Sequence, residues 1–336
     1  MKLGIVGLPQ SGKTSIFTAL TGEEPGADAA AGRSVTKVVR VPDRRLERLR
    51  DIFKPKSFKP ATFEVTDFGA GVSRESRLAL ERESDAMLVI LNAISADPAK
   101  QWGDFETEWA LADLSIAEKR HDKLKVQVKK ATPKEEKEKD LYELSVIEKV
   151  HAALAAEKAL RTIGLEEKEK AAIKHFNFFT LKPFLTVETI SESALAGYEP
   201  KLPGSLVVAG KLEGELALLP PDERASFLAD YGITEPAREK LIHGAYRLLG
   251  LHAFFTSGED EVRAWPIPVG TLAPRAAGAI HSDIERGFIR AEVVSFADFE
   301  ACGGTMKAAK AANKVRLEGK EYVVRDGDMI EFRFSV

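Results

Sequence analysis

Residues 7–14 read G-L-P-Q-S-G-K-T, match the pattern G-x-x-x-x-G-K-[ST], and directly follow an apolar run at residues 3–6. Glycine allows a loop to wrap its backbone N–H groups around an anion, and the helix expected from about Thr14 directs its positive end there. In this pattern Lys13 reaches the β and γ phosphates of a nucleotide, and the hydroxyl of Thr14 binds Mg²⁺. A glycine turn between an ordinary strand and helix is the simpler alternative. The pattern predicts a strand, a phosphate-binding loop and a helix.

Composition limits the class of protein. The chain has 336 residues, of which 44% are hydrophobic, enough for two or three cores. No window approaches the ~20 consecutive apolar residues of a membrane span, and the N-terminus leads into a strand rather than a signal sequence. The single cysteine, Cys302, excludes an intramolecular disulfide, and a net charge of -3 argues against wholesale wrapping of nucleic acid. We therefore expect a cytoplasmic, multi-domain protein without a membrane partner.

Strand-like and helix-like segments alternate along the first half of the chain. After the apolar run at 3–6, further strands are expected at 35–41, 62–67, 86–92, 183–187 and 205–209. Such alternation predicts a mostly parallel sheet that binds its ligand at the carboxyl ends of the strands. Asp67 ends one of these strands. Residues 23–33 lack apolar periodicity and are interpreted as a mobile loop where nucleotide-dependent switches usually lie.

Residues 111–160 are dense in Lys and Glu and are interrupted near 131–134. Spacings of three and four predict a helical hairpin, with the following residues on its inner faces: Leu114, Ala117, His121, Leu124 and Val128, then Leu141, Leu144, Glu148, His151 and Ala155. The charged faces are interpreted as solvated surface or as a docking surface for RNA or protein. The two histidines are expected to face each other without further ligands at metal spacing, so we interpret them as packing or surface residues.

The chain changes character again at about residue 251. Strand-like runs occupy 262–270 and 321–334, and Asp326-Gly327-Asp328 predicts a tight turn within the second run. Trp265 is interpreted as a packing anchor rather than a stacking platform. A small mixed α/β module is therefore expected at the C-terminus. Its basic residues form either an RNA-binding face or an ordinary surface: Arg286, Arg290, Lys307, Lys310, Lys314 and Arg316.

Several stretches together resemble one family. They are 4–9 (GIVGLP), 111–114 (LADL), 180–183 (TLKP), 255–258 (FTSG), 264–270 (AWPIPVG), 280–291 (IHSDIERGFIRA) and 326–328 (DGD). With them the chain resembles the YchF family, Obg-related P-loop NTPases with a helical insertion and a C-terminal TGS domain. The resemblance implies an α/β fold: a P-loop NTPase domain (1–112 and 175–250), an inserted α-helical hairpin (113–174) and a β-grasp-like TGS domain (251–336). It also implies binding of ATP in preference to GTP, slow hydrolysis and association with the ribosome.

Motif and resemblance together give a set of candidate site residues. The phosphate-binding residues are Gly7, Pro9, Gln10, Ser11, Gly12, Lys13, Thr14 and Ser15. Lys13 and Asp67 are the catalytic candidates, and Thr14 and Asp67 are the expected Mg²⁺ ligands. By resemblance, the backbone around Ile190 and Ser191 reads an adenine edge, and Ala209 and Gly210 form the loop under the base. The expected nucleotide is ATP, with GTP as the alternative.

Base choice has a physical basis. Guanine-specific enzymes use an N-K-x-D motif whose Asp accepts hydrogen bonds from N1 and N2 of guanine. At the matching place this chain reads T-I-S-E at 189–192, without that Asp. Residues 313–316 (NKVR) mimic only the first half of the motif and lie in the terminal module, where we interpret them as helix surface. The sequence therefore favours adenine.

The hydrolytic residues depart from the expected pattern. Ala70 stands where D-x-x-G has its γ-phosphate-sensing Gly, although Gly71 follows it, and Ala31 stands where a metal-binding Thr is expected, with Ser34 or Thr36 as substitutes. A histidine expected from the resemblance is missing from 94–104. Two hypotheses follow: a slow ATPase whose loops at 29–36 and 67–77 respond to the nucleotide, or a nucleotide-sensing protein that does not hydrolyse. A third is a ribosome or RNA adaptor built from the hairpin and the terminal module.

Overall fold

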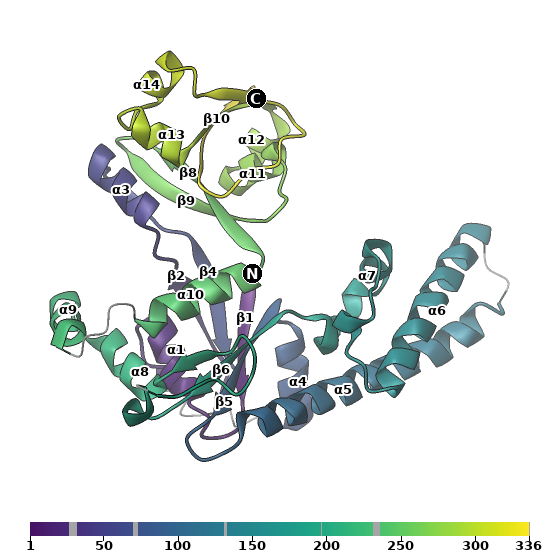
Figure 1. The fold of residues 1–336 in the computed structure, drawn as a ribbon. Coiled ribbons are helices and arrows are strands. Elements are labelled where there is room, and N and C mark those ends of the chain that lie inside the picture. The colour runs from purple at the N-terminus through teal and green to yellow at the C-terminus, as the bar shows by residue number, and fades with distance from the viewer. Residues whose placement is uncertain (27–31, 70–72, 131–132, 196, 231–235, 336) are drawn as a thin grey trace. The chain divides into compact units, whose positions relative to one another are not determined.

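The structure is a computed structural model that describes residues 1–26, 32–69, 73–130, 133–195, 197–230 and 236–335. The chain divides into two compact units, shown as ribbons coloured along the chain in Figure 1. Unit 1 consists of Met1, Thr36–Val65 and Pro220–Val336, and unit 2 consists of Lys2–Val35 and Thr66–Leu219. In the part of the chain that the structure describes, every helix is too short or too polar to span a bilayer.

Unit 2 is built on parallel strands in the order β1 (Lys2–Gly7), β5 (Ala86–Asn92), β6 (Phe184–Thr189) and β7 (Leu206–Val208). Ile5 pairs with Leu88, and Leu88 pairs with Leu185. Nearly every residue of β1 and β5 is buried, as expected for parallel strands covered on both faces. The carboxyl ends of these strands therefore lie at one edge of the sheet, where the phosphate-binding loop follows β1.

The strands expected from the sequence are present. Besides those of the parallel set, β2 covers Val35–Arg40 and β4 covers Thr62–Asp67. Helix α1 (Lys13–Thr21) packs against α8 (Gly210–Leu218). Their approach is close, because a Cβ added at Gly214 would lie 3.2 Å from the Ser15 carbonyl oxygen. The start of α1 and the start of α8 are thereby brought to the same side of unit 2.

The hairpin consists of α5 (Pro98–Gln127) and α6 (Lys134–Ala155), which extend away from the sheet in Figure 1. Its first helix begins well before residue 111, where the sequence interpretation placed it. Asp97 is the N-cap and accepts a hydrogen bond from Ala99 N at 3.1 Å, and proline stands at the first helical position. The sequence Asp97-Pro98 is a cap signal for a helix that begins there. It was missed because the composition becomes dense in Lys and Glu only in the later part of α5.

The inner face predicted for α6 is partly wrong. Ala117 and Leu124 of α5 are buried as predicted, but Leu141 of α6 is 47% exposed. The buried α6 residues of the hairpin core are Val146, Ile147, Val150, Ala153 and Leu154, and Leu144, which was predicted, packs against them while partly buried. The predicted face was displaced because the long charged side chains around 134–143 leave the tip of the hairpin without an apolar seam. Helix α7 (Glu167–Ile173) and the short helices η1 (Leu160–Thr162), η2 (Lys174–Phe176) and η3 (Phe179–Leu181) follow.

The two histidines of the hairpin face each other, as predicted. The rings of His121 and His151 stack with centroids 5.4 Å apart. A carboxylate lies near each ring: His121 Nε2 lies 3.7 Å from Glu148 Oε1, and His151 Nε2 lies 3.9 Å from Glu118 Oε1. Among the described residues, no group of three or more His, Cys, Asp or Glu side chains is arranged to hold a metal ion.

Unit 1 contains a mixed sheet in the order β11-β10-β12-β8-β9-β3. Its strands are β3 (Ser57–Lys59), β8 (Leu251–Ser257), β9 (Glu261–Pro268), β10 (Phe288–Ser295), β11 (Arg316–Glu318) and β12 (Asp328–Phe334). Strand β3 comes from early in the chain and pairs in parallel with β9, Phe58 opposite Val262. The interpretation of Trp265 as a packing anchor is confirmed, because it is 7% exposed, stacks on Phe254 and donates to Thr256 Oγ1 at 2.9 Å.

The helices of unit 1 are α3 (Arg44–Phe53), α9 (Pro221–Asp230), α10 (Ala237–Leu248), α11 (Ala273–Ile280), α12 (Ser282–Arg286), α13 (Phe296–Ala301) and α14 (Met306–Ala311). The predicted tight turn occurs at Asp326-Gly327, with Gly327 at φ 80°. The strand expected before it at 321–325 is wrong: Val323 forms only an isolated bridge with Leu272. Tyr322 instead donates its hydroxyl to Asp328 Oδ2 at 2.7 Å, which holds this segment without a ladder.

Candidate functional site

The loop after β1 has the backbone of an anion cradle. Gln10 and Gly12 have φ values of 61° and 92°, and Ser11 N donates to Leu8 O at 3.2 Å. A Cβ added at Gly7 would lie 2.4 Å from Ser11 Oγ and 2.7 Å from Ile90 O, so only glycine can stand there without a shift. No side chain caps the N-terminus of α1. Its first N–H groups are therefore available for an anion, and the helix dipole favours negative charge at the same point.

Lys13 lies at the first position of α1 and folds back over the loop. Its Nζ donates to Gly7 O at 2.9 Å and to Leu8 O at 2.8 Å. Burial lowers the pKa of Lys13, and the nearby carboxylates of Asp67 and Glu81 oppose that change. A partly desolvated ammonium attracts an anion more strongly than an ammonium in water, because the local dielectric is lower. Lys13 is thus placed over the loop that would hold phosphates.

Asp67 ends β4, as the sequence predicted. The residue is 8% exposed, and its Oδ1 is buried without a hydrogen-bond partner. Burial raises the pKa of Asp67, and the charge of Lys13 opposes that rise. An unpartnered buried carboxylate oxygen is costly unless a cation completes it. A hard divalent cation takes oxygen ligands of this kind, so Asp67, with the exposed hydroxyl residue Thr14, has the chemistry of a Mg²⁺ site.

A cavity of about 320 Å³ lies beside the loop, within the size range of small-molecule sites. The structure brings together there most of the phosphate-side and base-side candidates, and they come from the loop, α1, the end of β6 and the start of α8. Its candidate lining residues are Gln10, Ser11, Gly12, Ser15, Ile190, Ser191, Ala209 and Gly210. Pro9 is exposed on the loop and does not line this cavity. A single hollow can therefore take the base and sugar of a nucleotide whose phosphates lie on the loop.

Two polar side chains that the sequence interpretation missed hold the loop in place. Thr189 Oγ1 lies 2.8 Å from Ser11 O and 3.1 Å from Leu91 O. Asn92 Nδ2 donates to Gln10 O at 3.2 Å. Both residues stand at the last position of a buried parallel strand, which is the signal that could have identified them.

The two expected switch segments are described only in part. Ala31, Ala70 and Gly71, on which the sequence interpretation depended, lie outside the described residues, as do residues 29 and 30. Of the possible substitutes for the switch threonine, Ser34 is exposed in unit 2 and Thr36 belongs to unit 1. Gly69 lies against the first segment, because a Cβ added there would stand 2.1 Å from Gly32 O. The two segments therefore touch through backbone, and a side chain at position 69 would separate them.

Comparisons with known proteins identify relatives over the full length of the chain. A family model described as "YchF-GTPase_C: Protein of unknown function (DUF933)" matches residues 251–335. The chain is 39% identical to the "Ribosome-binding ATPase YchF" of Haemophilus influenzae, covering 100% of this chain and 99% of that protein. It is 38% identical to the Bacillus subtilis protein of the same name, covering 99% of both. The chain belongs to the YchF family.

The YchF fold is confirmed by a solved structure described as that of the Schizosaccharomyces pombe YchF GTPase. It superimposes with a TM-score of 0.86 at 28% identity, covering 99% of this chain and 97% of that chain. The α/β fold expected from the sequence is therefore correct. The names of these YchF relatives differ in the nucleotide, ATPase for the bacterial proteins and GTPase for the yeast one.

A charged cluster beside the loop was not anticipated from the YchF resemblance. On α4 (Arg74–Arg82), Arg77 Nη2 contacts Glu108 Oε1 at 3.2 Å, and Arg77 Nη1 lies 3.7 Å from Glu81 Oε1. Glu81 is 2% exposed. Burial raises the pKa of Glu81 to about 7, helped by Glu108 and opposed by Arg77 and Lys13. The i, i+4 spacing of Arg77 and Glu81 was the only sequence signal for this cluster.

Glu81→Gln is expected to stabilise the protein more at pH 8 than at pH 5. Because the folded-state pKa of Glu81 is raised from 4.5 to about 7, the folded state binds this proton more tightly than the unfolded state. Protonation of Glu81 therefore contributes to the stability of the folded state at low pH, and this contribution is lost as the pH rises through about 7. The neutral amide avoids the buried charge, and we expect a gain of about 2 kcal/mol at pH 8. Thermal melts of both proteins at the two pH values measure it.

The matched control is Glu75→Gln on the exposed side of the same helix. Its melting temperature should differ from that of the unsubstituted protein by a similar amount at both pH values. An equal effect of Glu81→Gln at pH 5 and pH 8 would contradict the raised pKa.

The basic residues of the terminal module are mostly engaged with carboxylates of the same unit. Lys310 contacts Glu292, Lys314 contacts Asp298 at 2.9 Å, and Arg316 contacts Glu318 at 3.0 Å; Arg286 pairs with Asp283. The interpretation of Asn313 and Lys314 as helix surface is wrong, because α14 ends at Ala311 and Asn313 has a φ of 54° in the turn that follows. These pairs reduce the free positive charge available to RNA on this YchF module.

Proposed function

We propose that this chain is a Mg²⁺-dependent nucleotide-binding protein that hydrolyses ATP slowly and acts at the ribosome in the cytoplasm. The observation that carries the proposal is the unpartnered, buried Oδ1 of Asp67 beside Lys13 and an uncapped helix N-terminus. The names of the bacterial relatives, ribosome-binding ATPases, support the ribosomal partner.

The residues proposed for each role come from the loop pattern and from the lining of the cavity beside it. Backbone N–H groups of the loop and Lys13 bind the phosphates, while Ile190, Ser191, Ala209 and Gly210 surround the base. The phosphate set is Gly7, Pro9, Gln10, Ser11, Gly12, Lys13, Thr14 and Ser15. Thr14 and Asp67 hold Mg²⁺, which when bound neutralises charge on the phosphate oxygens. Lys13 adds a fixed positive charge where negative charge develops, and this accounts for a modest hydrolysis rate without a dedicated base.

ATP is the proposed nucleotide, because residues 189–192 offer no carboxylate at the position of the guanine-reading Asp. Binding of ATP and GTP to the full-length chain, with Mg²⁺ and with EDTA, tests this proposal, and phosphate release from both nucleotides is measured in parallel. We expect tighter Mg²⁺-dependent binding of ATP than of GTP and slow release of phosphate from ATP. Tighter binding of GTP would overturn the base assignment.

The second candidate is a nucleotide-sensing adaptor that binds ribosomes or RNA without hydrolysis. The sequence departures at Ala31 and Ala70, where γ-phosphate and metal contacts are expected, favour it. Tight nucleotide binding with no phosphate release would select this candidate. Both candidates predict binding to ribosomes. Co-sedimentation with ribosomes at increasing salt, with and without nucleotide, measures this binding, because contacts to RNA phosphates weaken steeply with salt.

A further inference from the structure

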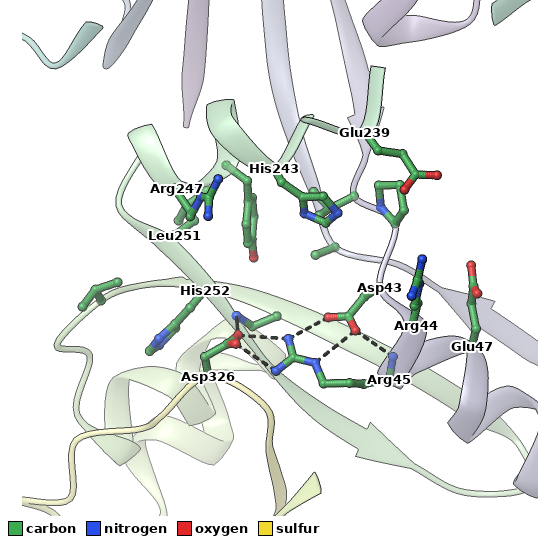
Figure 2. Close-up of a pocket in the computed structure, with 16 residues that line it drawn as sticks. Asp43, Arg44, Arg45, Glu47, Glu239, His243, Arg247, Leu251, His252 and Asp326 are labelled. Carbon is green, nitrogen blue, oxygen red and sulfur yellow. Dashed lines mark hydrogen bonds and ion pairs between the residues drawn. The ribbon is translucent and has the colours of Figure 1, made fainter. Parts of the chain in front are cut away.

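Unit 1 contains a second cavity that the proposed nucleotide site does not use. Its volume is about 800 Å³, and every lining residue belongs to unit 1, whereas the cavity beside the phosphate-binding loop is formed by unit 2. The walls come from the segment that leads into α3, from α10 and from the start of β8 (Figure 2). This size suits a small molecule of nucleotide or sugar-phosphate dimensions.

Two aspartates that line the cavity, Asp43 and Asp326, both form ion pairs with Arg45. Arg45 Nη1 contacts Asp326 Oδ2 at 2.8 Å, and its Nη2 contacts Asp43 Oδ2 at 2.8 Å. Asp43 also caps α3 by accepting from Arg45 N at 2.9 Å, and Asp326 accepts from Ala253 N at 3.3 Å. Although burial opposes the change, the hydrogen bonds that Arg45 donates to both carboxylates raise the pKa of Arg45, so this guanidinium stays charged. The two aspartates are therefore committed to Arg45 and to backbone.

Two polar atoms in the same walls have no partner. The Tyr246 hydroxyl and His252 Nε2 are both buried and form no hydrogen bond with the described residues. Tyr246 is 8% exposed and lines the cavity from α10, while His252 lines it from β8. Burial lowers the pKa of His252, so its imidazole is neutral at pH 7 and can donate through one nitrogen. Buried polar atoms are seldom left unpaired, so this pair indicates an occupant with hydrogen-bonding groups.

The remaining charges divide between the two ends of the cavity. Figure 2 shows Arg247 with His252 at one end, and Arg44, Glu47 and Glu239 at the other. Within the described chain, Arg247 forms no ion pair. Tyr246 precedes Arg247 in α10, and the charge of Asp326 acts on both Tyr246 and His252, so we assign Tyr246 to the first end. This end then offers a guanidinium, a hydroxyl and an imidazole, each able to donate a hydrogen bond. The other end offers two carboxylates and one guanidinium, which suit a partner with hydroxyl or amine groups.

We propose that this cavity binds a small phosphate monoester, with the phosphate at the end formed by Arg247, Tyr246 and His252. Three donors from different directions match the several oxygens of a phosphate, and a guanidinium gives its strongest hydrogen bonds to such an anion. Glu47 and Glu239 accept hydrogen bonds from hydroxyl groups at the other end of the molecule. The ligand class is thus a phosphorylated, hydroxyl-rich small molecule such as a sugar phosphate.

Ribose 5-phosphate, inorganic phosphate and ribose are the probes, titrated into the full-length protein. The readout is the set of imidazole NMR signals, because His243 and His252 line the cavity and the other four of the six histidines do not. We expect ribose 5-phosphate to shift the signals of these two residues saturably, inorganic phosphate to do so more weakly, and ribose to have no effect. Lys13→Ala should leave this response unchanged, which separates the cavity from the phosphate-binding loop.

Arg247→Ala should weaken ribose 5-phosphate binding by about tenfold or more, because a charge-assisted contact is lost. Tyr246→Phe keeps the ring but removes the hydroxyl, and should weaken ribose 5-phosphate binding by several-fold. The matched control is Arg290→Ala, which removes an exposed arginine of the same unit and should leave binding unchanged. The proposal is overturned if the signals of His243 and His252 do not respond, which would mean that water alone fills the cavity. It is also overturned if ribose binds as well as its phosphate, or if Arg247→Ala binds like the unsubstituted protein.

Discussion

Lys13→Ala is expected to lower phosphate release from ATP by about a hundredfold to a thousandfold, the usual cost of removing one group that stabilises transition-state charge. The substitution removes a side chain that donates to both Gly7 O and Leu8 O, and with it the charge that lies over the loop. Negative charge on a phosphate held by the loop would then lose a fixed positive charge beside it. Phosphate release at saturating ATP and Mg²⁺, with nucleotide affinity determined separately, measures the loss.

Lys307→Ala is the matched control, because Lys307 is an exposed lysine of α14 in the other unit. It should leave both affinity and turnover unchanged. A Lys13→Ala protein that binds and hydrolyses ATP like the control would sink the assignment of the phosphate-binding loop. If Lys13→Ala loses nucleotide binding and the unsubstituted protein binds ATP without measurable hydrolysis, the nucleotide-sensing adaptor is selected instead.

Asp113→Ala is expected to reduce the free energy of unfolding by about 3 to 5 kcal/mol, the range for breaking a buried ion pair by removing one partner. The Asp113 carboxylate is fully buried and accepts from Arg82 Nη1 at 2.7 Å. It also accepts from the backbone N–H groups of Phe179 and Thr180, at 3.0 and 2.8 Å, and from the Thr180 hydroxyl at 2.9 Å. Alanine would leave a guanidinium and two N–H groups without their acceptor.

Denaturant unfolding followed by tryptophan fluorescence measures this effect, since Trp102 and Trp109 lie in the same helix as Asp113. Asp104→Ala is the control, because Asp104 is exposed on that helix and its loss should cost no more than about 0.5 kcal/mol. A similar small loss for Asp113→Ala would show that the buried network contributes little. The network also explains two stretches that resembled the family, 111–114 and 180–183, because Asp113 and Thr180 meet there.

Elements with strong local signals were predicted almost residue by residue. The strands Thr62–Asp67 and Ala86–Asn92 were recovered because each is a short apolar run bounded by polar or turn residues. The start of α5 at Pro98 was missed although Asp97 and Pro98 form a cap signal, because the composition changes only later in that helix. The buried face of α6 was displaced because its charged tip obscures the three-and-four spacing.

The site residues likewise divide into those with a local sequence signal and those without one. Lys13, Thr14 and Asp67 were predicted because the loop pattern and the strand end fix their positions locally. Thr189 and Asn92 were missed, since their contacts with the loop depend on how parallel strands lie next to each other. The salt bridge of Arg45 with Asp326 joins residues 281 positions apart, and no local pattern signals it.

The sequence alone determined the phosphate-binding loop, the alternating strands and helices, and the membership that the relatives confirm. These features depend on neighbouring residues, whose spacing sets backbone conformation and burial. Tertiary structure alone decided the unpartnered oxygen of Asp67, the raised pKa of Glu81 and the cavity around Tyr246 and His252. The burial of these groups and the charges around them depend on residues that are distant in the chain. Only the packed structure therefore determines them.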